Sequence, residues 1–240
     1  MLKKVKMNEK VINKNVYPFT IPVIGNFKSL DINKNVTFIV GDNGSGKSTL
    51  LEAMAVCAGC NPEGGSKNLF FQTNETHSNL YDYLTLVYDW KKQSDVYFLR
   101  AESFYNVATE LENIHGFDGM EDIYGKSLHA MSHGESFLSL IENRFNRDGL
   151  FFLDEPEAAL SAMGQLSLLA YLNEFSKGDA QFIIATHSPL LVAFPHSDIY
   201  EIQDGNLMKK EYSDLEFVSI YKSFVNNPKG FINRLSRDEI

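Results

Sequence analysis

The alternation of apolar and polar segments predicts strands and helices that follow one another through the middle of the chain. Val36–Val40 (VTFIV) is a short β-branched run with polar flanks, which is typical of a buried strand. A glycine-rich turn, Gly41–Gly46, follows it, and Lys47–Ala58 has the composition of a helix. Further along, the pattern predicts strand Leu150–Leu153, helix Ala162–Ser176 and strand Gln181–Ala185. Strands that alternate with helices in this way are typical of a parallel sheet.

The segments between these elements are more polar. Residues 61–79 are rich in Asn, Gly, Ser and Thr and predict a loop, whereas residues 112–127, with three glycines and several acids, predict irregular structure. Two strands, Leu84–Trp90 and Val96–Arg100, are expected between them, joined by the polar turn KKQSD.

The remaining elements are two helices and a hairpin. Ser132–Arg147 carries apolar residues at helical spacing, namely Phe137, Leu138, Leu140, Ile141 and Phe145. After Ile199 we expect a hairpin around Asp204 and Gly205, and then a last helix near Leu215–Phe224. A length of 240 residues fits one large α/β domain, so we interpret residues 1–240 as a single domain.

Composition and charge narrow the class of protein. A hydrophobic content of 44% with 22% charged residues is ordinary for a globular protein. The net charge of −9 gives no indication of nucleic-acid binding by charge alone, although a local basic groove is compatible with it. No apolar run approaches the roughly 18 residues of a membrane span, and the N-terminus lacks the apolar stretch of a signal peptide. We therefore expect a cytoplasmic protein without a membrane span.

The two cysteines, Cys57 and Cys60, form a C-x-x-C pair that allows two interpretations. Such a pair can be a redox or zinc site, but zinc would need two further ligands, and the sequence has no second C-x-x-C and no H-x-x-x-H. The pair also lies at the end of the apolar run LLEAMAVCAGC, where small thiols pack well. We favour buried thiols near a helix end.

The glycine-rich turn carries the clearest chemical pattern. The segment GDNGSGKS matches G-x-x-x-x-G-K-[ST], in which glycines let backbone N–H groups turn toward phosphates at the start of a helix. Lys47 would reach the β- and γ-phosphates of a nucleotide, and the Ser48 hydroxyl would ligate Mg²⁺. The predicted ATP-binding residues are Gly41, Asn43, Gly44, Ser45, Gly46, Lys47, Ser48 and Thr49.

Two adjacent acids end the apolar strand LFFLDEP. Ligands of open α/β sheets bind at the carboxyl ends of the strands, so carboxylates there suit a catalytic site. We expect Asp154 to hold Mg²⁺ together with Ser48, and Glu155 to polarise or deprotonate an attacking water. A polar strand end that caps the next helix is the structural alternative.

With these patterns in place, two further motifs resemble the ABC ATPases. Ser132-His133-Gly134-Glu135 resembles the ABC signature L-S-G-G-Q, and Thr186-His187 resembles the switch histidine of that family. The resemblance implies that Ser132 and Gly134 contact the γ-phosphate of ATP held by the opposite subunit. It also implies that His187, with Lys47 and Glu155, acts on the γ-phosphate in its own site.

Other family positions are less clearly matched. The segment from Glu157 to Ser161 resembles the D-loop, although Ser161 stands where the family frequently has Asp. The Q-loop glutamine has no direct counterpart, and its candidates are Arg100, Glu102 and the earlier Gln72. Candidates for stacking on adenine are Tyr17 and Phe27, each of which is equally suited to packing.

Together, VTFIVGDNGSGKSTLLEA, FLRAESF, SHGESF, LDEPEAALS and FIIATHSP resemble a family of stand-alone bacterial ABC-type predicted ATPases, the AAA family ATPases. These are related to the ATPase heads of chromosome-maintenance and double-strand-break-repair proteins. The resemblance implies a P-loop NTPase of the ABC-type ATPase fold, with a mostly parallel sheet flanked by helices and an antiparallel β subdomain. It further implies Mg²⁺-dependent ATP hydrolysis by a nucleotide-dependent homodimer that acts on a protein partner not identified by the sequence.

Two alternatives share these motifs. One is the ATP-binding subunit of a membrane ABC transporter, which the missing Q-loop glutamine and the FLRAESF segment disfavour. The other is a nucleotide-gated binding protein with negligible turnover, against which the carboxylate of Glu155 argues.

Overall fold

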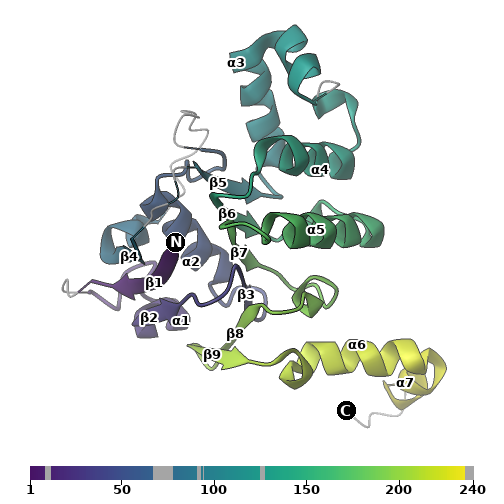
Figure 1. Ribbon diagram of the computed structural model, residues 1–240. Helices are drawn as coiled ribbons and strands as arrows, with labels where there is room; N and C mark the ends of the chain where they lie inside the picture. Colours follow the sequence, from purple (N-terminus) through teal and green to yellow (C-terminus); the bar gives the residue numbers. More distant parts are fainter. Residues whose placement is uncertain (9–11, 67–77, 91–92, 94, 125–127, 236–240) are drawn as a thin grey trace.

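The computed structural model describes residues 1–8, 12–66, 78–90, 93, 95–124 and 128–235 (Figure 1). Most of the predicted loop 61–79 and most of the turn KKQSD therefore lie outside the described residues. Two sheets, one of six strands and one of three, organise the described part of the chain. Within that part, no helix combines the length and the apolarity needed to cross a membrane.

The larger sheet has the strand order β5-β6-β7-β3-β8-β9. Its strands are β5 (Asp95–Arg100), β6 (Gly149–Asp154), β7 (Gln181–Ala185), β3 (Val36–Val40), β8 (Asp198–Gln203) and β9 (Asn206–Lys210). All neighbouring pairs are parallel except β8 and β9, which are antiparallel. The predicted α/β fold with a mostly parallel sheet is thus confirmed. The predicted hairpin is confirmed too, because Asp204 and Gly205 connect β8 to β9 with φ angles of 49° and 70°.

The smaller sheet is antiparallel, with the order β2-β1-β4. Its strands are β1 (Leu2–Met7), β2 (Ser29–Asp31) and β4 (Leu84–Tyr88). It confirms the expected antiparallel subdomain. The predicted strands Leu84–Trp90 and Val96–Arg100 both form, but they belong to different sheets: β4 pairs with β1, and β5 pairs with β6.

Helices cover both faces of the large sheet (Figure 1). On one face, α2 (Lys47–Ala58) contacts β5, β6 and β7 and also reaches β4 of the small sheet. On the other face lie α4 (His133–Arg144) and α5 (Ala162–Phe175). Side chains of β3 alternate between the two cores: Phe38 packs on the α4–α5 side and Ile39 on the α2 side. Burial on both faces explains why four of the five residues of β3 are apolar.

One prediction in the middle of the chain is wrong. Residues 112–124 are helical, because they continue α3 (Phe104–Tyr124). Its first turns carry the buried side chains of Phe104, Val107, Ala108 and Leu111, at the i, i+3, i+4, i+7 spacing of a helix face. The helix is anchored by these buried side chains and continues into residues 112–124. The glycines and acids of that segment alone would favour irregular structure.

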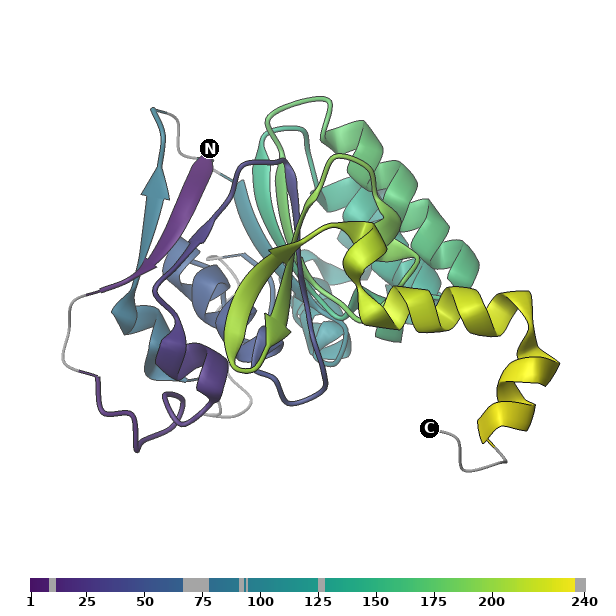
Figure 2. The ribbon, with the colours of Figure 1, turned by 90° about the horizontal axis from the view of Figure 1, so that it is seen from below.

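The C-terminal prediction was incomplete. The expected helix corresponds to α6 (Glu216–Asn226), but a further helix, α7 (Pro228–Leu235), follows it. Figure 2 shows the two helices extending away from the body of the protein. The rings of Phe224 and Phe231 meet edge to face at 5.8 Å. The remaining short elements are α1 (Pro22–Asn26) and the 3₁₀ turns Asn79–Tyr83, Leu128–Ala130, Pro156–Ala158, Leu191–Ala193 and Tyr212–Asp214.

The cysteines lie at the end of α2. Cys60 is buried and Cys57 is half-buried, and neither is joined in a disulfide bond. Burial raises the pKa of the Cys60 thiol, with a smaller contribution from the charge of Asp95. The buried environment of Cys60 agrees with the packing interpretation of this residue.

Candidate active site

The glycine-rich turn between β3 and α2 adopts a conformation that requires glycine. Gly41, Gly44 and Gly46 have φ angles of 148°, 75° and 100°, in the region that residues with a Cβ rarely adopt. A Cβ on Gly46 would lie 2.8 Å from the side chains of Ile21 and Val23. A Cβ on Gly44 would meet nothing within 4 Å, so the backbone there faces open space. The turn therefore presents its amides to a ligand at the start of α2.

Lys47 lies inside this turn. Its side chain is only 3% exposed, and Nζ donates hydrogen bonds of 2.9 Å to the backbone oxygens of Gly41 and Asp42. Burial lowers the pKa of Lys47, while the carboxylates of Glu155 and Asp154 act in the opposite direction. The ammonium group is thus held where backbone carbonyls and carboxylates surround it.

The acids that end β6 lie beside this turn. Asp154 is the last residue of β6 and pairs in register with Arg100, the last residue of β5. Glu155 follows in the left-handed conformation, with φ 47° and ψ 52°, and its amide donates to the carbonyl of Ala185 at 2.9 Å. A left-handed backbone costs a non-glycine residue about 1–2 kcal/mol, and such strain is concentrated at functional sites.

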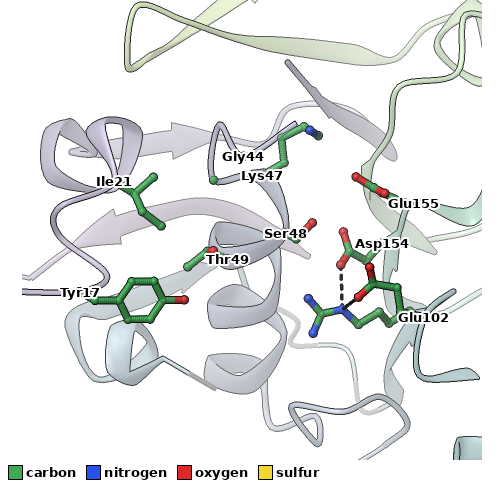
Figure 3. Close-up of a pocket in the computed structure, with 11 residues that line it drawn as sticks. Tyr17, Ile21, Gly44, Lys47, Ser48, Thr49, Glu102, Asp154 and Glu155 are labelled. Atoms are coloured by element: carbon green, nitrogen blue, oxygen red, sulfur yellow. Dashed lines mark ion pairs between the residues drawn. The ribbon is translucent and has the colours of Figure 1, made fainter. Parts of the chain in front are cut away.

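These segments enclose one pocket of about 320 Å³ (Figure 3). The glycine turn and α2 contribute Lys47 and Ser48, and the end of β6 contributes Asp154 and Glu155. The other lining residues are Tyr17, Ile21, Gly44, Gly46, Thr49, Arg100 and Glu102. Residues that are distant in the sequence, and that we selected separately for phosphate and metal chemistry, therefore share one cavity.

Asp154 is the most buried acid of the pocket, with 3% of its surface exposed. Burial raises its pKa to about 6, although the Arg100 guanidinium and the Ser48 hydroxyl both act to lower it. Its Oδ2 lies 3.1 Å from Arg100 Nε, while the buried Oδ1 makes no hydrogen bond to the described residues. A carboxylate oxygen and a nearby hydroxyl are the hard ligands that Mg²⁺ prefers, so the residues present fit this ion.

Glu155 links the pocket to His187. Nε2 of His187 lies 3.2 Å from Oε1 of Glu155, and each side chain is about one third exposed. The backbone N–H of His187 also donates to the carboxylate of Glu157. His187 lines a neighbouring groove of about 640 Å³ together with Gly41 and Asp42 of the turn. It is therefore coupled to the pocket through Glu155 and lies beside the same glycine turn.

The fold and this pocket can be compared with known proteins. Residues 10–127 match the family model of an AAA domain, and this region contains the glycine turn, Lys47 and Arg100.

This match is consistent with an ATPase of the AAA or ABC type.

Among solved structures, the protein is similar to the SMC head domain from Thermotoga maritima, with 16% identity over 88% of this chain and 99% of the other and a TM-score of 0.48. It is also similar to cbiO1 from Clostridium perfringens, described as part of the ABC transporter complex cbiONQ. That similarity has 18% identity over 99% of this chain and 100% of the other, with a TM-score of 0.49. No curated protein matches the chain.

Six expected site residues are absent from the pocket lining, namely Gly41, Asn43 and Ser45 of the glycine turn, His187, and the pair Ser132 and Gly134. Ser132 and Gly134 lie at the start of α4, where Ser132 forms a capping box with Glu135. The Ser132 amide donates to Glu135 Oε2 at 3.0 Å, and its hydroxyl donates to the same oxygen at 2.7 Å. A Cβ on Gly134 would lie 3.1 Å from the backbone oxygen of Ala159, so glycine allows this segment to approach closely. Ser161 caps α5, which accounts for a serine there.

The structure separates the weaker candidates. Arg100 and Glu102 both line the pocket, whereas Gln72 lies outside the described residues. Tyr17 lines the pocket and is 57% exposed, whereas Phe27 is buried in the core beside α2. Tyr17 is therefore the better placed aromatic for a nucleotide base.

One charged residue near the pocket was missed. Glu52 accepts a hydrogen bond from Arg100 Nη1 at 3.0 Å and thus belongs to the polar network around Asp154. It lies one helical turn after Ser48 on α2, so the i, i+4 spacing from this predicted metal ligand could have identified it.

Proposed function

We propose that the protein binds ATP with Mg²⁺ in the pocket of Lys47 and hydrolyses it to ADP and phosphate, acting as a single ABC-type ATPase domain. The observation that carries this proposal is the convergence of Lys47, Ser48, Asp154 and Glu155 on one pocket. A phosphate-binding turn alone fits many nucleotide-binding proteins. The two carboxylates beside it favour hydrolysis, because they supply a metal ligand and a base.

The phosphates would lie on the backbone amides from Gly41 to Thr49. Lys47 would exchange its present contacts with the Gly41 and Asp42 carbonyls for the β- and γ-phosphate oxygens. Tyr17 lines the same pocket, on the far side from Glu155 in Figure 3, and would contact the base. Ser48 and Asp154 would hold Mg²⁺, which supplies charge neutralisation of the phosphate oxygens when bound.

Hydrolysis would begin with Glu155. Its carboxylate accepts a proton from a water molecule, whose oxygen forms a bond to the γ-phosphorus. The bond from that phosphorus to the β,γ-bridging oxygen breaks, and ADP leaves with the electron pair. Lys47 stabilises the negative charge on the phosphate oxygens, while His187, 3.2 Å from Glu155, holds the carboxylate in position and contacts the γ-phosphate.

A second copy of the chain would complete the site. Ser132 and Gly134 lie outside the pocket of their own chain, at the N-terminus of α4, where helix amides and a hydroxyl suit an anion. We propose that two chains meet head to tail, so that each α4 N-terminus contacts the γ-phosphate held by the other chain. ATP would favour this closed dimer through contacts that the open form lacks.

The dependence of turnover on protein concentration tests this function. We expect ATP hydrolysis per chain to rise with concentration and to level off once the dimer forms, because an isolated chain lacks the second set of phosphate contacts. Phosphate release and light scattering should be followed in the same samples. A rate per chain that stays constant over concentrations at which scattering shows dimers dissociating would contradict the shared site.

A further inference from the structure

An arginine lies at the acidic end of the pocket, where the proposed metal ligand is also found. Arg100 ends β5, beside Asp154 at the end of β6, and its guanidinium contacts acids from three segments. Nε is 3.1 Å from Asp154 Oδ2 and 3.9 Å from Glu102 Oε2, while Nη1 is 3.0 Å from Glu52 Oε2. Figure 3 marks the ion pairs of Asp154 and Glu102 with dashed lines.

We propose that Arg100 competes with the divalent metal for Asp154, and that Glu52 retains the arginine when the metal displaces it. This inference rests on the proposed function and assigns a new role to Arg100, a candidate for the Q-loop position, and to Glu52. Arg100 is a positioning residue here, because it acts through the carboxylate of Asp154.

The competition follows from the number of charges at the carboxylate. Asp154 is almost fully buried, and its single negative charge is now paired with the guanidinium. Oδ1 makes no hydrogen bond to the described residues, so it is the oxygen that could accept a metal. A divalent metal there would bring a second and larger positive charge to the same carboxylate. Two cations at one buried carboxylate repel each other, so binding of the metal weakens the pair with Arg100.

Arg100 remains charged throughout this exchange. A guanidinium stays protonated in proteins, and here it also lies between the carboxylates of Asp154 and Glu52. Loss of a proton from Arg100 therefore cannot relieve the repulsion. The guanidinium must move away from the metal, or another carboxylate must balance its charge.

Glu52 supplies that compensation. It binds Nη1, on a different part of the guanidinium from the Nε that faces Asp154. The Glu52 carboxylate is itself fixed, because Oε1 accepts a hydrogen bond from the Ser78 amide at 3.4 Å. The arginine can thus lose its contact with Asp154 and keep its contact with Glu52. Without Glu52, Arg100 would form a stronger ion pair with Asp154 and would compete more strongly with the metal.

The test measures metal affinity directly, with Mn²⁺ as the probe and a non-hydrolysable ATP analogue at saturation. Free Mn²⁺ is followed by electron paramagnetic resonance. We expect Arg100→Gln to tighten Mn²⁺ binding about tenfold, which equals about 1.4 kcal/mol, and Glu52→Gln to weaken it by a similar factor. In the double variant the effect of Glu52→Gln should disappear, because Glu52 acts through Arg100.

Arg147→Gln is the matched control. It removes the same charge from a residue that is 61% exposed and pairs with Glu174 on the surface, so Mn²⁺ affinity should not change. Unchanged or weaker Mn²⁺ binding in Arg100→Gln would overturn the competition. An equal loss from Glu52→Gln with and without Arg100 would overturn it as well, because a general charge effect would then suffice. If Arg100→Gln does not fold, Glu52→Gln keeps the proposal falsifiable, since unchanged or tighter Mn²⁺ binding in that variant contradicts it.

Binding of the analogue in EDTA separates this inference from the proposed function. Wild-type protein that fails to bind the analogue with or without metal would contradict the nucleotide site itself. Wild-type protein that binds the analogue but shows the same Mn²⁺ affinity as Arg100→Gln would contradict only the competition.

Discussion

Glu155→Gln is expected to leave ATP binding intact and to lower ATP hydrolysis by about 10²–10⁴-fold, the usual contribution of a general base. Glutamine has nearly the same shape and keeps an oxygen that can face His187, 3.2 Å away in the wild-type protein. Its amide cannot accept the proton of the attacking water. Phosphate release under single-turnover conditions measures the loss, and a labelled ATP analogue measures binding.

The same variant should accumulate as an ATP-bound dimer, because the closed form would no longer be released by hydrolysis. Light scattering with and without ATP detects this change in mass. Glu174→Gln is a suitable control, since Glu174 lies on the surface and pairs with Arg147 and Lys177. Normal turnover by Glu155→Gln would show that another group acts as the base.

Lys47→Ala has the second largest expected effect, a loss of ATP affinity of at least about 100-fold. The ammonium is buried and directed into the glycine turn, and charge-assisted hydrogen bonds contribute about 1.5–3 kcal/mol each. Two such bonds to the β- and γ-phosphates account for a loss of this size. Isothermal titration with ATP measures the affinity.

Lys177→Ala provides the comparison for this change. Lys177 is 60% exposed and pairs with Glu174, so the same side chain is removed away from the pocket. Circular dichroism should show that both variants are folded, because Lys47 also binds the carbonyls of Gly41 and Asp42. If folded Lys47→Ala bound ATP as tightly as Lys177→Ala, the phosphates would have to lie elsewhere.

The sequence predicted well those elements whose signals are local. The limits of β3, α2 and β7 agree with the predicted ranges Val36–Val40, Lys47–Ala58 and Gln181–Ala185. In each case an apolar run or a helix-forming run is bounded by glycine or polar residues. The convergence of the glycine turn with Asp154 and Glu155 also followed, because parallel strands place their carboxyl ends at one edge of a sheet.

Features that depend on distant contacts could not be predicted in this way. The sequence around β4 does not show that its partner is β1, more than 70 residues earlier. The second half of α3 contains glycines that disfavour a helix, so its helical structure depends on the packed first half that begins at Phe104. The pairing of Arg100 with Glu52 and Asp154 joins three elements that no local pattern in the sequence links.

The proposed function depends on the position of Ser132. Its hydroxyl caps α4 within the chain, and the pocket of the same chain does not include it. Our proposal therefore requires that the pocket of one chain and the α4 N-terminus of another act on the same ATP. Loss of either component from one chain should be rescued by a chain that retains it.

A mixing experiment with Lys47→Ala and Ser132→Arg tests this claim most directly. Each variant alone should be inactive, because every site in its homodimer lacks one component. In an equal mixture, half of the dimers contain both variants. Each of these dimers has one intact site, formed by the glycine turn of the Ser132→Arg chain and by Ser132 of the Lys47→Ala chain. The account predicts recovery of about a quarter of the wild-type ATPase rate. A mixture as inactive as its parts, or full activity of Ser132→Arg alone, would contradict it.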